Sequence, residues 1–125
     1  MCGGFHHWLD GRAEAFVASG DGWQLAFSHE LVEMLVDPTI RDDGNWGRMA
    51  LAGKKAWLVE VGDPVEDSRF SYTRDGVALS DFVTPAWYRG GSRGPWDFMG
   101  HVTRAFSILE GGYAWYVRNG GWVEA

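Results

Sequence analysis

The segment from Trp23 to Pro38, WQLAFSHELVEMLVDP, constrains the fold most, because it has the length and both end signals of a single α-helix. Asp21 supplies an acid at the N-cap position, and Gln24 stands at the third helical position, where its side chain can reach back to the cap. Pro38 disfavours helical geometry at Asp37 and has no N–H to donate, so the helix is expected to stop there. The rest of the chain is therefore expected to fold around one helix.

Two sides of this helix are apolar. At about 100° per residue, one stripe contains Phe27, Leu31, Met34 and Leu35, and a second contains Leu25, Val32 and Val36. The polar sector holds His29, Glu30, Glu33 and Asp37. A helix with two apolar sides is expected to be largely buried, and buried carboxylates require a cation or dense hydrogen bonding. The simpler alternative, which spacing alone favours, is that the polar sector is a solvated face.

The polar sector contains a His-Glu-x-x-Glu pattern at His29, Glu30 and Glu33. In the zinc helix H-E-x-x-H, two imidazoles one turn apart bind zinc while the glutamate activates water. Here Glu33 takes the place of the second imidazole. Because a carboxylate is an acceptable zinc ligand, the pattern predicts a metal site, although with less specificity than the two-histidine motif.

Length and composition narrow the class of protein. The 125 residues suit a single domain over residues 1–125, and eight Trp with eighteen Gly favour short strands, tight turns and aromatic packing. A net charge of −6 without a run of Lys or Arg argues against nucleic acid as a partner. The single cysteine, Cys2, cannot form an internal disulfide. We find no signal-peptide pattern and no apolar run long enough for a membrane span, so we expect a cytoplasmic or virion protein with no membrane partner.

Several segments outside the helix have strand signals. A strand is expected at Ala13–Ala18 and a hairpin at 70–79 with an Asp-Gly turn. Residues 83–88 are expected to be extended at a sheet edge, because Pro85 cannot donate to a strand ladder. Turn-separated aromatic runs predict a β-rich meander over 96–123.

Carboxylates gather after the strongest predicted strand. Residues 57–61 run into a Gly-Asp-Pro turn, which brings Glu60, Asp63 and Glu66 together at the strand end. At least one of them could face the helix, although acids beside such a turn also occur for local hydrogen-bonding reasons. The stretch before this strand, 39–55, has no periodicity and is expected to be a long loop.

Two adjacent histidines, His6 and His7, lie near the start of the chain between Phe5 and Trp8. Neighbouring residues on an extended segment point in opposite directions, so only one of the two imidazoles would face a given site. The alternative is that both are ordinary surface or packing residues.

Separated blocks of the chain, taken in order, resemble one family. The blocks are SHELVEMLVDP at 28–38, VEVGDPVED at 59–67, GVALSDFVTPAWY at 76–88, and WDFMG followed by EGGYAWYV within 96–117. They are similar to zincin-like, His-Glu-x-x-Glu predicted metallopeptidases of bacteriophages and bacteria. The resemblance implies an α+β fold in which a small twisted sheet packs on the motif-bearing helix, together with the β-rich C-terminal meander.

The resemblance also implies roles for particular residues. His29 and Glu33 would hold the metal with a further acid, for which Glu60 is preferred and Asp63 is the alternative. Glu30 would be the general base that polarises a metal-bound water for attack on a carbonyl. His6, in a Gly-aromatic-His element, would be a metal ligand or a transition-state donor.

The expected metal is zinc, with manganese or iron also suited to the site. A ligand set of one imidazole and two carboxylates holds zinc less tightly than a set richer in nitrogen, and it suits these other ions as well. A peptide or protein is the expected substrate.

Two functions of different classes remain open at this stage. The first is a metal-dependent hydrolase, specifically a peptidase. The alternative is a structural or interaction protein of a phage virion, which keeps the zincin-like fold and a structural or vestigial metal site and binds a virion or other protein. Its support is a surplus of aromatic residues, namely Trp87, Tyr88, Trp96, Tyr113, Trp115, Tyr116 and Trp122. A carbohydrate-binding module would also use exposed aromatics, but it gives no role to the helix motif.

Overall fold

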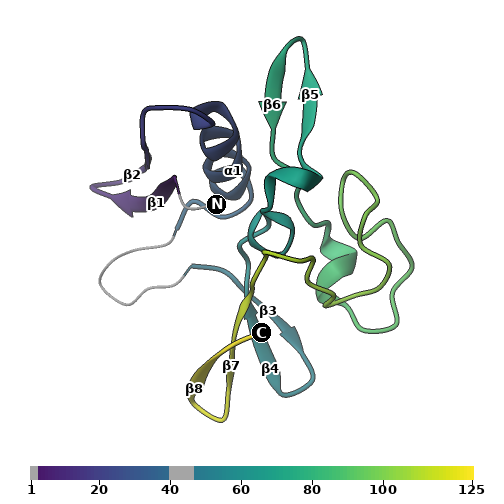
Figure 1. Cartoon of the computed structure of the whole chain (residues 1–125). Helices are drawn as coiled ribbons and strands as arrows, with labels where there is room; N and C mark the ends of the chain where they lie inside the picture. Colours follow the sequence, from purple (N-terminus) through teal and green to yellow (C-terminus); the bar gives the residue numbers. More distant parts are fainter. Residues whose placement is uncertain (1–2, 40–46) are drawn as a thin grey trace.

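The computed structural model describes residues 3–39 and 47–125 (Figure 1). Cys2 and residues 40–46 of the expected loop lie outside these ranges. The described chain has one α-helix, α1 (Trp23–Val36), and eight strands. The strands are β1 (Gly4–Leu9), β2 (Arg12–Val17), β3 (Met49–Ala52), β4 (Lys55–Leu58), β5 (Tyr72–Arg74), β6 (Val77–Leu79), β7 (Trp115–Arg118) and β8 (Gly121–Glu124). The expected α+β class is confirmed.

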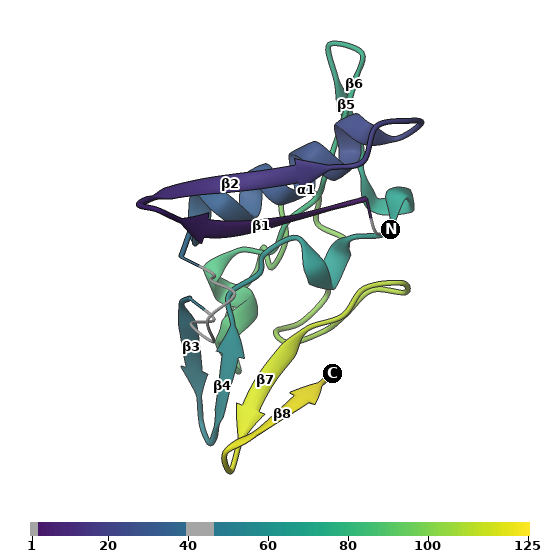
Figure 2. The same ribbon diagram turned by 90° about the vertical axis from the view of Figure 1, so that its left-hand side faces the viewer.

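The strands form three separate antiparallel sheets. Strands β1 and β2 make one hairpin, β5 and β6 make another, and the third sheet has the order β3-β4-β7-β8. The β1–β2 hairpin lies along α1, whereas the four-stranded sheet lies at the opposite end of the molecule (Figures 1 and 2). The strands that pack on the helix are therefore those of the two hairpins.

The helix begins at Trp23 and ends at Val36, close to the predicted limits. The predicted cap at Asp21 is wrong: the N-cap is Gly22, at φ 83°, with no side-chain hydrogen bond. Glycine adopts this left-handed geometry without steric cost, so the chain can turn sharply into the helix. At the other end the Asp37 N–H donates to Glu33 O at 2.7 Å, and the Asp37 carboxylate accepts from the Thr39 and Arg48 backbone N–H groups.

The exposure of the helix matches its hydropathy on one apolar side only, where Leu25 is buried and Val32 and Val36 pack against the core. His29, Glu30 and Glu33 are buried. Four apolar residues spaced one turn apart are instead 41–76 % exposed, namely Trp23, Phe27, Leu31 and Leu35. Both sequence-based interpretations are therefore wrong in part, because the polar sector is not solvated and one apolar stripe is not covered. The cause is that β1 and the segment after β4 pack against the polar side.

The hydrophobic core lies between the four-stranded sheet and the irregular segments, and it is largely aromatic. The Trp57 ring meets the Trp87 ring edge-on at 5.2 Å and stacks on the Phe106 ring at 5.3 Å. Trp87 is fully buried, and its indole N–H donates to Ser107 O at 2.8 Å. Most of the aromatic surplus is thus used inside the protein, although Trp115 and Trp122 are 37 % and 41 % exposed.

Three local predictions need correction. Pro85–Tyr88 is a 3-10 helix and not an extended edge, because Pro85 fits the first helical turn and this conformation buries Trp87. The expected loop at 39–55 contains strand β3, which begins at Met49. The expected strand over 57–61 ends at Leu58, so the acids that follow it lie in turns and a 3-10 helix.

Other local predictions are confirmed, wholly or in part. Strand β2 covers most of the expected strand at 13–18, and β5–β6 is the expected hairpin, with Asp75 at φ 52° and Gly76 at φ 81°. The C-terminal meander is confirmed only for β7 and β8. The earlier part of the expected meander, residues 96–114, forms no strand, and Asp97 makes an isolated β-bridge with Val83.

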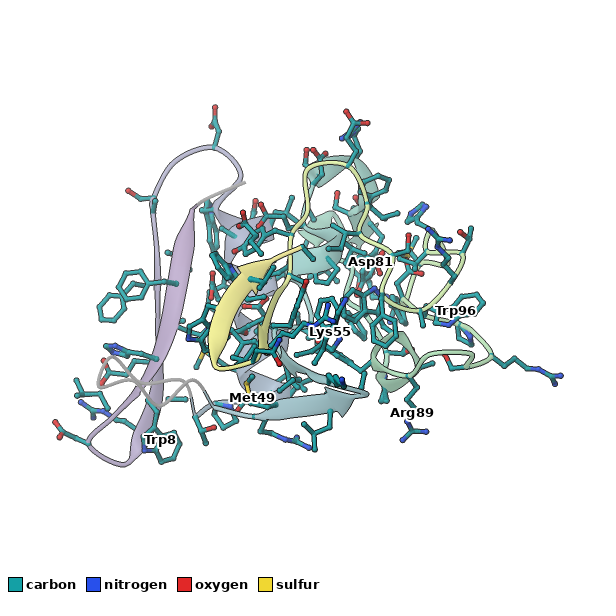
Figure 3. The ribbon with its side chains drawn as sticks, turned by 90° about the horizontal axis from the view of Figure 1, so that it is seen from below. Trp8, Met49, Lys55, Asp81, Arg89 and Trp96 are labelled. Carbon is teal, nitrogen blue, oxygen red and sulfur yellow. The ribbon has the colours of Figure 1, made fainter. Side chains whose placement is uncertain are left out.

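A pair of buried acids holds the irregular part of the chain together. Asp81 and Asp97 have no exposed surface. Figure 3 labels Asp81 among the side chains drawn as sticks. Asp81 Oδ1 accepts from the Phe82 and Met99 backbone N–H groups at 2.9 and 3.0 Å. The Asp97 carboxylate accepts from the His101 and Val102 N–H groups at 2.9 and 3.0 Å. Burial and the neighbouring Asp97 carboxyl raise the pKa of Asp81 to about 7.

This pair predicts a specific pH dependence of stability. Between about pH 4 and pH 7, the folded protein keeps a proton on Asp81 that the unfolded chain has released, so the free energy of unfolding falls as pH rises. In Asp81→Asn, an amide N–H faces Asp97 at every pH, and we expect a shallower fall over this window. The pH dependence is measured from the midpoints of urea unfolding between pH 4.5 and pH 8, in buffer that contains a metal chelator. Asp75→Asn, at the exposed hairpin turn, is the matched control, and an equal slope in both variants would contradict the assignment.

Candidate metal centre

Two imidazoles and five carboxyl groups line one pocket of about 270 Å³. The helix α1 contributes His29, Glu30 and Glu33, and β1 contributes His6. Glu60, Asp63 and Glu66 come from the turns and the 3-10 helix that follow β4, and Tyr113 also lines the pocket. No Lys or Arg is among the described residues that line it.

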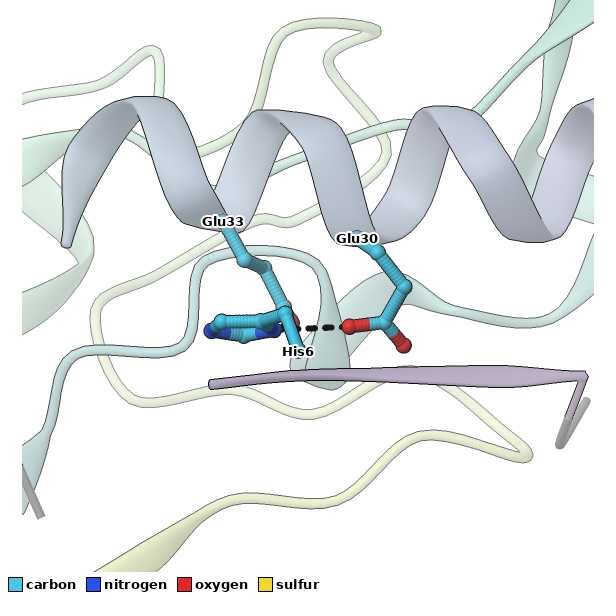
Figure 4. Close-up of side chains that lie close together, drawn as sticks. All are labelled: His6, Glu30 and Glu33. Carbon is cyan, nitrogen blue, oxygen red and sulfur yellow. Dashed lines mark hydrogen bonds and ion pairs between the residues drawn. The ribbon is translucent and has the colours of Figure 1, made fainter. Parts of the chain in front are cut away.

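His6 connects strand β1 to the helix. Its Nδ1–H donates to Glu30 Oε2 at 2.7 Å, and Nδ1 is 3.6 Å from Glu33 Oε2 (Figure 4). The other ring nitrogen, Nε2, is 3.6 Å from Glu60 Oε2. Alternation along β1 directs His6 to the helix and leaves His7 on the other face, near Glu14. Only one of the adjacent histidines enters the site, as expected.

His29 faces two acids from different segments. Its Nε2 is 3.1 Å from Asp63 Oδ1 and 3.2 Å from Glu33 Oε1. Glu33 Oε1 also accepts from the Gly62 backbone N–H at 3.2 Å. Neighbouring ligands of an ion bound at about 2.0–2.2 Å are separated by about 3 Å or slightly more, so these atoms have the spacing of a shared coordination sphere.

Burial and mutual repulsion shift the pKa values of the acids. Burial, with the charges of Glu33 and Asp63, raises the pKa of Glu60 to about 12. Burial and the Asp63 charge raise that of Glu33 to about 7. Burial disfavours protonated His29, but hydrogen bonds with Asp63 and Glu33 outweigh it and raise its pKa to about 11. The pocket therefore gathers more negative charge than its side chains can balance, and it attracts protons or cations.

Gly62 lets the turn approach the helix. It has an ordinary helical φ of −85°, so no backbone strain requires glycine here. A Cβ atom at this position, however, would lie 2.6 Å from His29 Nδ1 and 3.1 Å from Glu33 Oε1. The absence of a side chain at Gly62 is therefore what allows His29, Glu33 and Asp63 to converge.

The side chains fit a metal ion in composition and placement. His6, Glu30 and Glu33 form one group of potential ligands, and His29, Asp63 and Glu66 form a second. All these residues are buried. Imidazole and carboxylate together suit zinc, manganese and iron, and this donor set does not select among them. The pocket could thus hold a metal ion whose identity is open.

All the residues singled out from the sequence reach this pocket: His6, His29, Glu30, Glu33, Glu60 and Asp63. Asp63 is the acid nearest His29, whereas Glu60 faces His6. Asp37, one turn beyond Glu33, instead binds the backbone at Thr39 and Arg48. Glu66 was noted in the acid cluster but not selected as a site residue, and Tyr113 was missed because nothing in its Glu-Gly-Gly turn indicates a site.

Comparisons of the chain with known protein families, with curated proteins and with solved structures give no match. Over the described ranges, no helix has the length and apolar character needed to cross a membrane.

Proposed function

We propose that this protein is a metal-dependent hydrolase that acts on peptides, with a zincin-like arrangement around α1. The observation that carries the proposal is the convergence of two imidazoles and five carboxyl groups, most of them buried, on one pocket. No lysine or arginine among the described residues lines it. Buried carboxylates without a cation are costly, and a divalent ion would offset that cost.

In this proposal His29, Glu33 and Asp63 hold the ion, because their facing atoms are 3.1–3.2 Å apart around His29 Nε2. When bound, a divalent ion acts as a Lewis acid toward a carbonyl oxygen and makes water more acidic. Glu30 is the general base that accepts the proton of the attacking water. The His6 N–H, at 2.7 Å, holds the Glu30 carboxylate in place.

Tyr113 fits the same chemistry as a neutral donor. Burial and the nearby charges of Asp63 and Glu66 raise the pKa of its phenol, so the hydroxyl stays protonated. A protonated phenol at the pocket wall can donate to an oxygen that gains negative charge during attack.

Metal content tests the proposal directly. Protein purified without added metal or chelator is expected to carry zinc, manganese or iron, and Glu33→Ala is expected to lose it, because Glu33 Oε1 faces His29 Nε2 at 3.2 Å. Elemental analysis beside Glu124→Ala, on the exposed strand β8, supplies the matched control. A parent protein that takes up no metal even after titration would overturn the proposal.

A second candidate function, a structural or interaction protein such as a virion component, is favoured by the exposed stripe on α1. Trp23, Phe27, Leu31 and Leu35 stand one turn apart and present a continuous apolar ridge. Exposed apolar patches of this kind often mark protein interfaces.

This candidate function predicts an assembly with a mass well above the 13.9 kDa of one chain. Leu31→Ser is expected to reduce it to the monomer, because the smaller, polar side chain removes apolar contact area from the middle of the ridge. Leu51→Ser is the control, since Leu51 is 82 % exposed but lies on β3, outside the ridge on α1. Light scattering measures the mass. A parent that is monomeric and binds no partner would count against this function.

A further inference from the structure

The ion proposed at His29, Glu33 and Asp63 does not use all the potential ligand atoms in the pocket. On the β1 side, His6 Nε2 and Glu60 Oε2 face each other at 3.6 Å, with side chains only 4 % and 11 % exposed. Neither atom has a hydrogen-bond partner within residues 3–39 and 47–125. Burying two polar atoms without hydrogen-bond partners costs free energy of folding, so the fact that they face each other requires an explanation.

The hydrogen bond on the other side of the ring sets the chemistry of His6. Because Nδ1–H donates to Glu30 at 2.7 Å, Nε2 of the neutral imidazole carries the lone pair. A carboxylate that accepts the second N–H of a ligating imidazole is the usual outer partner of a metal-bound histidine. At 3.6 Å, Nε2 and Oε2 are too far apart for a hydrogen bond, yet both can lie at about 2.0–2.2 Å from one ion between them.

Glu33 lies between the two halves of the pocket. Its Oε1 is 3.2 Å from His29 Nε2, whereas its Oε2 is 3.6 Å from His6 Nδ1. The two oxygens of one carboxylate thus face different imidazoles. A carboxylate between two imidazoles can bridge two metal ions, which in two-metal sites lie about 3.5–4 Å apart, provided that its Oε2 turns from Nδ1 toward an ion at Nε2.

The charge of the pocket points the same way. Five carboxyl groups line it, with no lysine or arginine from the described parts of the chain. With all five carboxyl groups ionised, as metal binding favours, one divalent cation would leave three of the five negative charges uncompensated, whereas two would leave one. Uncompensated charge is most costly where side chains are buried, as they are here.

We propose that the pocket is a dinuclear centre, in which His6 Nε2 and Glu60 Oε2 hold a second divalent cation and Glu33 is shared with the cation at His29 and Asp63. This inference rests on the proposed function, because it adds a second ion to the same pocket. It also gives Glu60 a role different from the one expected from sequence: a ligand on the His6 side and not the third ligand of His29.

Zinc stoichiometry tests the second site without any substrate. Metal-free protein is titrated with Zn²⁺ by calorimetry, and bound metal is counted after dialysis. We expect two equivalents in the parent and in Glu124→Gln, one in His6→Ala and in Glu60→Gln, and a loss of tight binding at both positions in Glu33→Ala. Glu60→Gln keeps the shape of the side chain, so the test stands even if His6→Ala folds poorly.

Manganese supplies an independent readout of the shared carboxylate. Two Mn²⁺ ions bridged by Glu33 are expected to give the multiline electron paramagnetic resonance spectrum of an exchange-coupled pair, and His6→Ala is expected to give the spectrum of an isolated ion.

The outcomes separate the two proposals. No bound metal in the parent overturns both of them. One equivalent at saturation overturns the second site and leaves the hydrolase proposal standing. Two equivalents that persist in both His6→Ala and Glu60→Gln place the second ion elsewhere and overturn the inference.

Discussion

Glu30→Gln is expected to keep its bound metal and to lose hydrolytic activity by about 10²–10⁴-fold, the usual contribution of a positioned general base. The glutamine amide has almost the same shape, and its oxygen can still accept the His6 N–H that Glu30 accepts at 2.7 Å. The substitution therefore removes basicity and little else. The arrangement of ligands around His29 should be unchanged.

The measurement has two arms, because loss of activity alone would not separate a base from a ligand. Turnover of an internally quenched peptide library reports hydrolysis, and elemental analysis of the same preparation reports metal. Glu124→Gln makes the same chemical change on the exposed strand β8 and should match the parent in both arms. Retained turnover in Glu30→Gln would exclude the base role, and parallel loss of metal would make Glu30 a ligand.

Gly62→Ala is expected to weaken metal binding by about 10–100-fold, the range found when groups that orient metal ligands are disturbed. The added methyl would lie 2.6 Å from His29 Nδ1 and 2.8 Å from His29 Cε1, so the imidazole or the turn must move. Either movement separates His29 from Asp63 and disturbs the N–H that Gly62 donates to Glu33 at 3.2 Å. Few single methyl groups in this chain should have so large an effect on the site.

Gly121→Ala is the matched control, because a Cβ there would meet its nearest atom, Arg118 O, at 3.8 Å, an ordinary contact. Zinc affinities of the two variants, measured by competition with a coloured chelator, give the comparison. If Gly62→Ala binds zinc as tightly as Gly121→Ala, the close approach at Gly62 does not control the ligands.

Local signals predicted the limits of α1 and the turn between β5 and β6. The limits of α1 followed from Pro38 and from the length of the periodic segment, and the β5–β6 turn followed from Asp75-Gly76, whose positive φ values such turns require. These features depend on neighbouring residues alone. The cap at Gly22 was missed because a glycine in left-handed geometry can replace a side-chain cap, and the sequence does not show which of the two is used.

The site residues on the helix were predictable, but the partners of each were not. The preference for Glu60 assumed that the strand continued through Val61, whereas β4 ends at Leu58 and the following turn changes the direction of every side chain. Asp63 therefore meets His29, and Glu60 meets His6. The residue at which a strand ends, here Leu58 and not Val61, is decided by tertiary packing, and periodicity does not show it.

Hydropathy could not predict that the polar side of α1 is buried. Periodicity grouped His29, Glu30 and Glu33 correctly on one side, but it could not say that this side is buried while Leu35 is 76 % exposed. Burial of the polar side depends on His6 and on the acids after β4, which are distant in sequence.

The β1–β2 hairpin lies along α1 and contributes His6, whereas the acids of the pocket come from α1 and from the turns after β4. Ions held between them would cross-link three stretches of the chain, as disulfides do in small secreted proteins, in a sequence whose single cysteine cannot form such a link internally. A chelator would then act here as a reducing agent acts on those proteins. The first consequence would be proteolytic cleavage of the N-terminal hairpin, while the Trp57–Trp87 core remained folded.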